Sequence, residues 1–476
     1  MSLNTALNTA QMSLGATAKQ ISVSARNVAG ADDPNYSRKL APLVTTNGVG
    51  RVSGPIRASD PRLFERYLDA TSASARDQAM LDGFTRLAST VGDTAAGTSL
   101  VARSGRMIDA LQEYANAPND ANLGRALVSE AKDLSRALND AARSVEGLRI
   151  ETESEIHSSA DRVNKLLADF EKLNTRITQG TSIGRDVTDD LDQRDSVLAQ
   201  IASEIGVSTV ARANNDLVLY TDGGVTLFEK TARTVEVVET TPGELHVSID
   251  GVRVTGDASP MPSKNGRLVG LANLHSEVLP EYARQLDNVA FGLISAFKEV
   301  DPAAVGPDLA GVFTNAGSAT LPTSATPAPG DRPGWLAASI AVNTAVDPAA
   351  GGDVQKLRDG INYTFNTDSS ASFSGRLFGM LTEVSGKQAA LGNKTLLEYG
   401  ASTVSWLEGE RQSTDSASKA NTAVLQRVST SLSNARGVDV NDEAAVQLQL
   451  ERSFAASAQL ISVIDNLFKT LLAIVR

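Results

Sequence analysis

The sequence contains no cysteine, only three histidines and few aromatic residues. The absence of cysteine excludes disulfide bonds and thiolate metal sites. His157, His246 and His275 lie far apart in the sequence, and we interpret each as a surface or hydrogen-bonded side chain rather than a metal ligand. Aromatic residues make up 4% of the chain, whereas hydrophobic residues make up 41%. Small side chains therefore predominate, which favours helices packed through alanine, serine and threonine.

Long apolar runs and basic runs are also missing. No apolar segment is long enough to span a bilayer. The first basic residue is Lys19, and the early leucines are dispersed, so we expect no cleaved secretory signal. The net charge is −12, which makes nucleic acid and anionic membranes poor partners. These features predict a protein that is cytoplasmic, or that is exported by machinery that needs no cleaved signal.

The two ends of the sequence carry apolar residues at helical spacing. Near the N-terminus one row is apolar, and the adjacent row, with Leu3, is mostly small. Near the C-terminus the apolar positions alternate in steps of four and three, and the helix is expected to begin near Asn441. We predict that the two helices pair with each other and with further copies, because each would expose apolar surface alone. The predicted interface residues are Leu3, Leu7, Leu14, Ile21, Val28, Leu450, Phe454, Ile461, Ile464, Phe468, Leu471 and Val475.

Between these ends the pattern changes from helical to β-rich and back. Helical spacing dominates up to about Ile205, with a weak stretch at 152–159, and alternation between turn signals over 207–256 predicts short antiparallel strands. The predicted fold class is mainly α with a β-rich middle: paired terminal helices as a coiled coil, a long helical bundle and an inserted α+β domain. The predicted domains are an assembly domain (1–36 plus 437–476), a helical rod with short strands (37–186 plus 377–436) and a β-rich, mixed middle domain (187–376).

Five aspartates gather within 186–195, and carboxylates at this spacing share a helix face. One interpretation is a metal site or a carboxylate-dependent extracellular enzyme. Stability or activity that depends on calcium or magnesium would support it. The alternative is structural: Asp186 caps a helix, the acidic residues favour its N-terminus, and Arg194 pairs with a neighbour. We favour the structural reading, and therefore predict no enzyme and no catalytic, cofactor-binding or metal-binding residue.

Short motifs at both ends and in the middle resemble those of flagellar axial proteins. Asn27-Val28-Ala29, followed by Pro34-Asn35-Tyr36-Ser37-Arg38, is similar to a turn motif of that family. The segment Asp190-Leu191-Asp192-Gln193-Arg194-Asp195 closely resembles a signature of the first hook-associated proteins within it. The motif residues that carry the resemblance are Asn27, Tyr36, Arg38, Asp190, Asp192, Arg194 and Asp195. Another axial component, such as a hook, rod or flagellin-like protein, is the alternative and should lack the second motif.

The resemblance implies an extracellular structural subunit that joins hook to filament. It implies export in an unfolded state, without a cleaved signal peptide, through the flagellar type III apparatus. The implied partners are further copies of the chain in a ring or helical layer, the hook protein, the next hook-associated protein and an export chaperone at the C-terminal helix. Family members typically have terminal helices that are disordered in the monomer and fold on assembly. No cofactor is implied.

Overall fold

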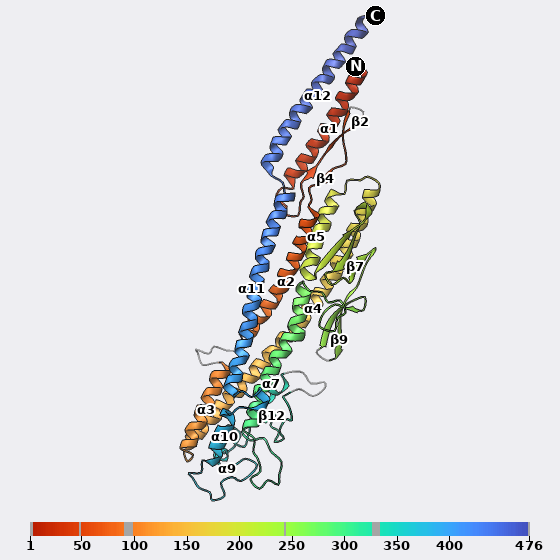
Figure 1. The fold of residues 1–476 in the computed structure, drawn as a ribbon. Coiled ribbons are helices and arrows are strands. Elements are labelled where there is room, and N and C mark those ends of the chain that lie inside the picture. Colours follow the sequence, from red (N-terminus) through yellow and green to blue (C-terminus); the bar gives the residue numbers. More distant parts are fainter. Residues whose placement is uncertain (1–2, 47–48, 90–98, 242–243, 326–333, 475–476) are drawn as a thin grey trace.

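The chain forms an elongated rod with both termini at one end (Figure 1). The computed structural model describes residues 3–46, 49–89, 99–241, 244–325 and 334–474. Long helices run along the rod, and small sheets lie beside its middle. The predicted fold class, mainly α with a β-rich middle and long terminal helices, is confirmed.

The first and last helices pack against each other at the terminal end of the rod. They are α1 (Leu3–Ala29) and α12 (Val440–Ile474). Ser13 and Ser457 share a hydrogen bond of 3.3 Å across the pair, so small polar side chains occupy part of the contact. Two short hairpins lie beside α1: β1 (Lys39–Leu40) with β4 (Ile56–Arg57), and β2 (Leu43–Thr46) with β3 (Val49–Val52).

Five helices build the shaft: α2 (Pro61–Ala88), α3 (Leu100–Asn116), α4 (Ala121–Ser182), α5 (Thr188–Glu204) and α11 (Leu396–Arg436). α4 has 62 residues and is therefore about 93 Å long. The helical pattern weakens at 152–159, yet α4 continues because polar side chains there find partners. The Thr152 hydroxyl donates to the Leu148 carbonyl at 2.7 Å, and Ser159 bonds the Glu204 carboxylate of α5.

Two antiparallel sheets cover one side of α4 at mid-rod. The first has the order β5-β6-β7-β8 and the second the order β11-β10-β9. Their strands are β5 (Val207–Ala211), β6 (Leu217–Thr221), β7 (Thr226–Glu229), β8 (Thr231–Ala232), β9 (Val235–Thr241), β10 (Glu244–Ile249) and β11 (Val252–Arg253). A short 3-10 helix, Ala213–Asn215, joins β5 to β6.

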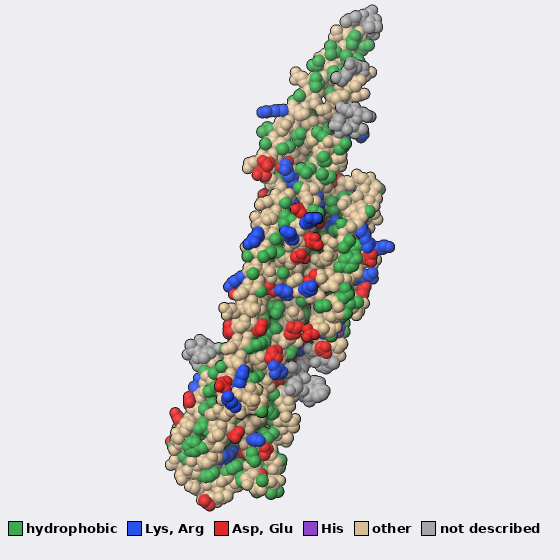
Figure 2. All heavy atoms as spheres, viewed as in Figure 1, with side chains coloured by type: hydrophobic (Ala, Val, Ile, Leu, Met, Phe, Trp, Pro, Cys, Tyr) green, Lys and Arg blue, Asp and Glu red, His purple; other side chains and the backbone are tan. Residues whose placement is uncertain are grey.

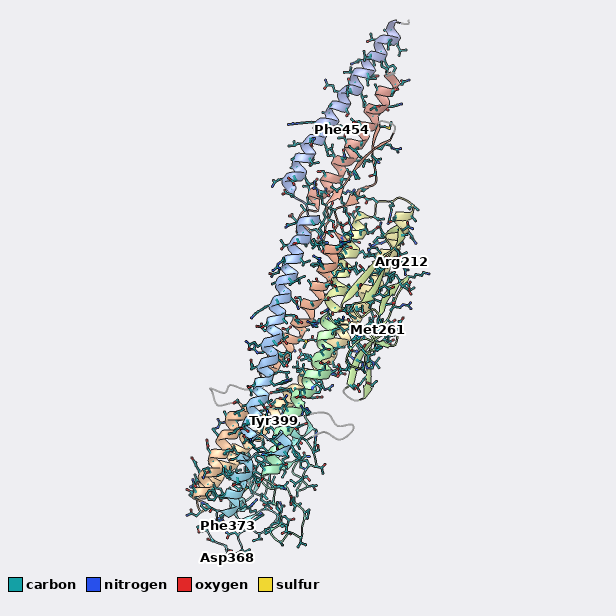
Figure 3. The ribbon with its side chains drawn as sticks, viewed as in Figure 1. Arg212, Met261, Asp368, Phe373, Tyr399 and Phe454 are labelled. Carbon is teal, nitrogen blue, oxygen red and sulfur yellow. The ribbon has the colours of Figure 1, made fainter. Side chains whose placement is uncertain are left out.

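The end of the rod away from the termini contains shorter elements and long loops (Figure 3, where Asp368 and Phe373 mark it). α6 (Arg267–Asn273) continues through a π-helical turn, Leu274–Val278, into α7 (Leu279–Ala296). The remaining elements are β12 (Phe313–Asn315), α8 (Trp335–Ser339), β13 (Ile340–Val342), α9 (Lys356–Asp359), α10 (Gly375–Ser385) and the 3-10 turns Pro348–Ala350 and Ala389–Leu391.

Buried hydrophobic side chains form two clusters along the shaft, and α4 contributes to both. One cluster includes Leu134 of α4 and Leu286 of α7, towards the loop-rich end. The other includes Phe170 of α4, Ile201 of α5 and Phe228 of β7, beneath the sheets. Within the described residues, no helix is both long and apolar enough to cross a membrane. The division into three predicted domains stays a prediction.

Candidate functional site: the neck network

The terminal helix pair joins the shaft through a cluster of polar and charged side chains, which we call the neck network. Its members are Ser24, Asn27, Tyr36, Arg38, Lys39, Arg57, Asp189, Asp192, Asp195 and Glu443. They come from α1, the segment between α1 and β1, the strands β1 and β4, α5 and α12, so the network joins distant parts of the sequence.

Asn27, at the end of α1, is the centre of the network and is only 1% exposed. Its amide nitrogen donates to the Lys39 carbonyl at 2.9 Å and to the Glu443 carboxylate at 3.2 Å. Its amide oxygen accepts from the Tyr36 hydroxyl at 3.0 Å and from the Lys39 backbone N–H at 2.8 Å. One side chain thus orients the turn after α1, the first strand and the start of α12.

Glu443 is the contribution of α12 and is 2% exposed. Its carboxylate accepts from Arg38 Nε at 2.6 Å and from the Ser24 hydroxyl at 2.8 Å. A buried carboxylate is stable only when it is paired and hydrogen-bonded, and here the partners are supplied from the opposite end of the chain. Glu443 therefore fixes the beginning of α12 against the end of α1.

The aspartate motif of α5 holds the strands that follow α1. Arg57 donates to Asp192 at 3.2 Å and to Asp195 at 2.7 Å. The Lys39 ammonium, whose side chain is fully buried, pairs with Asp189 and lies 3.6 Å from Asp192. The motif therefore supplies anchoring carboxylates for the neck.

Two motif residues act within the shaft instead. Asp190 pairs with Arg185 at 3.1 Å, across the turn between α4 and α5. Arg194 donates to the Asn174 side chain at 2.8 Å and to the Asn215 carbonyl at 2.5 Å. It thereby joins α5 to α4 and to the turn between β5 and β6.

Burial shapes the electrostatics of these groups. It raises the pKa of Tyr36 to about 12 and lowers the pKa of Lys39, which Asp192 opposes. Burial alone would lower the pKa of Arg57, but Asp195 and Asp192 outweigh it and hold that pKa above its ordinary value. Burial lowers the pKa of Arg194 to about 10, so it stays charged at neutral pH. The network is built to hold charges in place.

One detail of the structural reading was wrong. Asp186 is not the cap of α5: Val187 occupies that position, while Asp186 accepts from Thr188 N–H at 3.1 Å and pairs with Arg26 of α1. The partners of Arg194 are the Asn174 side chain and the Asn215 carbonyl, to which its guanidinium donates. α12 begins at Val440, one residue before the predicted Asn441, and the Asp439 carboxylate accepts two backbone N–H groups there.

Ser24, Lys39 and Glu443 were not predicted as members of the site. Ser24 lies in the small row of α1, next to the apolar row from which most of the α1 interface residues were predicted. Glu443 stood out only as an acidic residue in the first turn of α12. Lys39 carried no sequence signal, since its partners lie about 150 residues away.

The predicted terminal interface residues divide between buried and exposed positions. On α1, Leu3, Leu7, Leu14 and Ile21 are partly buried and Val28 is exposed. The buried positions are Ala10, Thr17 and Ser24 of the small row, together with Ala16, Val23 and Asn27. On α12, Ile464 is buried, Leu450, Ile461 and Phe468 are partly buried, and Phe454 (labelled in Figure 3) and Leu471 are exposed. Val475 lies outside the described residues. Their contacts with other copies stay a prediction.

The carboxylates that could have served an enzyme are engaged in this structure. Asp192 and Asp195 both accept from Arg57, and Asp189 pairs with Lys39. Across the described part of the chain, no three side chains of the types that bind metals come together as a ligand set. The geometry explains the aspartate cluster as a set of ion pairs that fix β1 and β4 to α5.

Comparison with known proteins finds a family match and a similar structure for this architecture. Residues 84–317 match the family model of the flagellar hook-associated protein FlgK helical domain. The fold is similar to that of the flagellar hook junction protein FlgK from Burkholderia pseudomallei, with a TM-score of 0.58 and 15% sequence identity, covering 77% of this chain and 99% of that one. No curated protein matches the chain in sequence.

Proposed function

We propose that this chain is a structural subunit joining hook to filament, because residues 84–317 match the FlgK helical-domain model and the fold is similar to that of a flagellar hook junction protein FlgK. The terminal pair α1–α12 is its assembly element. The neck network sets the orientation of that pair relative to the shaft. On this proposal the three segments predicted from the sequence act as an assembly domain, a rod and a middle domain.

An exposed apolar row on α12 carries the proposal. Leu460, Val463, Leu467 and Leu471 lie beside the contact with α1 and are 57%, 49%, 48% and 50% exposed. We call this row the outer stripe. Figure 2 shows mostly hydrophobic and uncharged side chains at the terminal end of the rod, whereas charged side chains gather along the middle. A contiguous apolar row on an exposed helix is typical of a surface that another protein covers.

Neighbouring copies of the chain are the natural cover for the outer stripe, with the hook protein on one side and the next hook-associated protein on the other. We propose that the subunit works outside the cell and leaves it unfolded, without a cleaved signal. An export chaperone would cover the apolar faces of α12 before assembly. A chain without cysteine suits this route, since its folding needs no oxidation step.

Electron microscopy of cells that lack this chain tests the position in the flagellum. We expect bare hooks, with flagellin lost to the culture medium. Normal filaments would contradict the proposal, and missing hooks would identify the chain as a rod or hook component instead.

A charge introduced into the outer stripe tests the assembly element. Leu460→Asp combined with Leu467→Asp should leave the monomer folded, because both side chains are already exposed. Assembly should fail, since each charge would be buried against a neighbour at a cost of several kcal/mol. Ser462→Asp, at an exposed polar position of the same helix, is the matched control and should assemble normally. Filaments of normal number from the double variant would contradict this role of α12.

A further inference from the structure

A cleft of about 750 Å³ opens in the neck beside the aspartate motif. Its walls come from the β4 strand, the first turns of α2, one face of α5 and the end of α11. Apolar side chains, including Ile56 and Phe64, line it together with Arg194. The volume is within the usual range for pockets that take a ligand or a peptide segment.

Arg194 is the unusual group in this cleft. It is 4% exposed, and its Nε has no hydrogen-bond partner. Its guanidinium bonds only a side-chain amide and a backbone carbonyl, and forms no ion pair with any described carboxylate. Asp195 and Asp216 favour its charge electrostatically but do not hydrogen-bond to it, so an incoming carboxylate would give this buried guanidinium a direct partner.

The cleft carries an excess of positive charge on a chain whose net charge is −12. Five arginines line it: Arg57, Arg62, Arg185, Arg194 and Arg436. Arg57 pairs with Asp192 and Asp195, and Arg185 pairs with Asp190, whereas the other three form no ion pair with the described residues. Of the three carboxylates on its walls, Asp60 accepts backbone N–H groups of α2, and Asp195 accepts from Arg57. The cleft is therefore suited to an acidic occupant.

An acidic surface lies on the other side of the end of α11. Asp32, Asp33, Asp439 and Asp442 are exposed there and surround a second hollow, which shares Arg436 with the cleft. Asp32 and Asp33 sit at the tip of the turn after α1, and no cation in the described residues pairs with them. The neck thus presents a basic cleft and an acidic turn at one level of the rod.

We propose that the cleft of one copy receives the Asp32–Asp33 turn of a neighbouring copy. Two different but complementary patches on one subunit are what a heterologous contact requires, and such contacts generate rings or helical layers. The inference rests on the proposed function, because it needs copies that stand side by side at the same level. The carboxylate of the turn would accept from the unpartnered edge of Arg194.

Cross-linking in assembled flagella tests this contact, and the chain has no native cysteine to interfere. In cells whose only copy carries Ala31→Cys and Ser59→Cys, which keep both carboxylates of the turn, isolated flagella treated with a short bis-maleimide should yield a ladder of cross-linked multimers. Ser59 lines the cleft, and the pair Ser59→Cys with Asp368→Cys, at the far end of the rod, is the control that should stay monomeric. Flagella that contain the chain but give no ladder would overturn the contact and leave the proposed function intact. A native chain absent from the hook–filament junction would instead overturn the proposed function.

Charge variants in the Ala31→Cys, Ser59→Cys background test the role of the arginines. Arg194→Gln should lower the cross-linked fraction about tenfold, as expected for a charged pair lost from an interface. Arg62→Glu, at an exposed position, should lower it without affecting the fold, and adding Asp33→Arg should restore it. An unchanged ladder in Arg62→Glu and Arg194→Gln would overturn the proposal.

Discussion

Asp287 shows how a single buried carboxylate holds a loop at the far end of the rod. Its oxygens accept from the backbone N–H groups of Gly334 at 2.6 Å, Leu336 at 3.0 Å and Ala337 at 2.8 Å, at the start of α8. Burial raises the pKa of Asp287 to about 6, in spite of these three donors. The folded protein therefore binds this proton more tightly than the unfolded chain does.

The pKa of Asp287 predicts a pH dependence of stability. Its stabilising effect is fully present below about pH 4 and is lost as the pH rises through about 6, with a total on the order of 2–3 kcal/mol. Denaturant unfolding of the native chain and of Asp287→Asn at pH 4.5 and pH 7 measures the free energy of unfolding. The loss of stability between the two pH values should be smaller in the variant by the contribution of Asp287. Equal pH dependence in both proteins would contradict it.

Substitution of Asn27 should measure how much the neck network contributes to stability. Asn27→Ala removes four hydrogen bonds and leaves buried groups of Tyr36, Lys39 and Glu443 without that partner. The free energy of unfolding should fall by about 1–3 kcal/mol. Asn8→Ala, at an exposed position of the same helix, is the control and should change it by less than about 0.5 kcal/mol. A similar loss in both variants would exclude a special role for Asn27.

At the scale of elements, α6 packs closely against α2 through a glycine. A Cβ atom at Gly270 would lie 2.5 Å from the Arg76 carbonyl oxygen, so no side chain fits without moving a helix. Gly270→Ala should destabilise the chain by about 1–3 kcal/mol, as overpacking does. Gly147→Ala, in an exposed position of α4 with nothing within 4 Å, should stabilise it by about 0.5–1 kcal/mol. Thermal unfolding of both variants measures this difference, and a loss in both would contradict the packing argument.

The elements were more predictable from the sequence than their contacts. Apolar spacing is a local signal, so helices were expected at both ends of the chain and through the region of α4, and the predicted start of the last helix near Asn441 is within one residue of Val440. The face of α1 that packs inward was not predicted from the leucines, because small side chains permit a closer approach between helices than leucines do. The partners of Asp192 and Asp195 depend on the pairing of β1 with β4, which brings Lys39 and Arg57 together. A sequence motif identifies such a site without revealing what it binds.

At the scale of the whole molecule, the terminal pair should be the least stable part of the monomer. Most side chains of α12 are exposed, whereas α4 buries a continuous face in both hydrophobic clusters. Amide hydrogens of α12 should therefore exchange many times faster than those in the middle of α4. Hydrogen exchange on the monomer and on assembled flagella checks this, and slow exchange of α12 in the monomer would contradict it.

The continuity of α4 has a mechanical consequence. One uninterrupted backbone ladder passes through both hydrophobic clusters, without a hinge between them. A bending or twisting load applied near the neck is therefore transmitted to the distal loops by a stiff strut, since side-chain packing on both clusters resists its rotation. Deformation under load should concentrate at the ends of α4, where the chain turns into α5 on one side and follows α3 on the other.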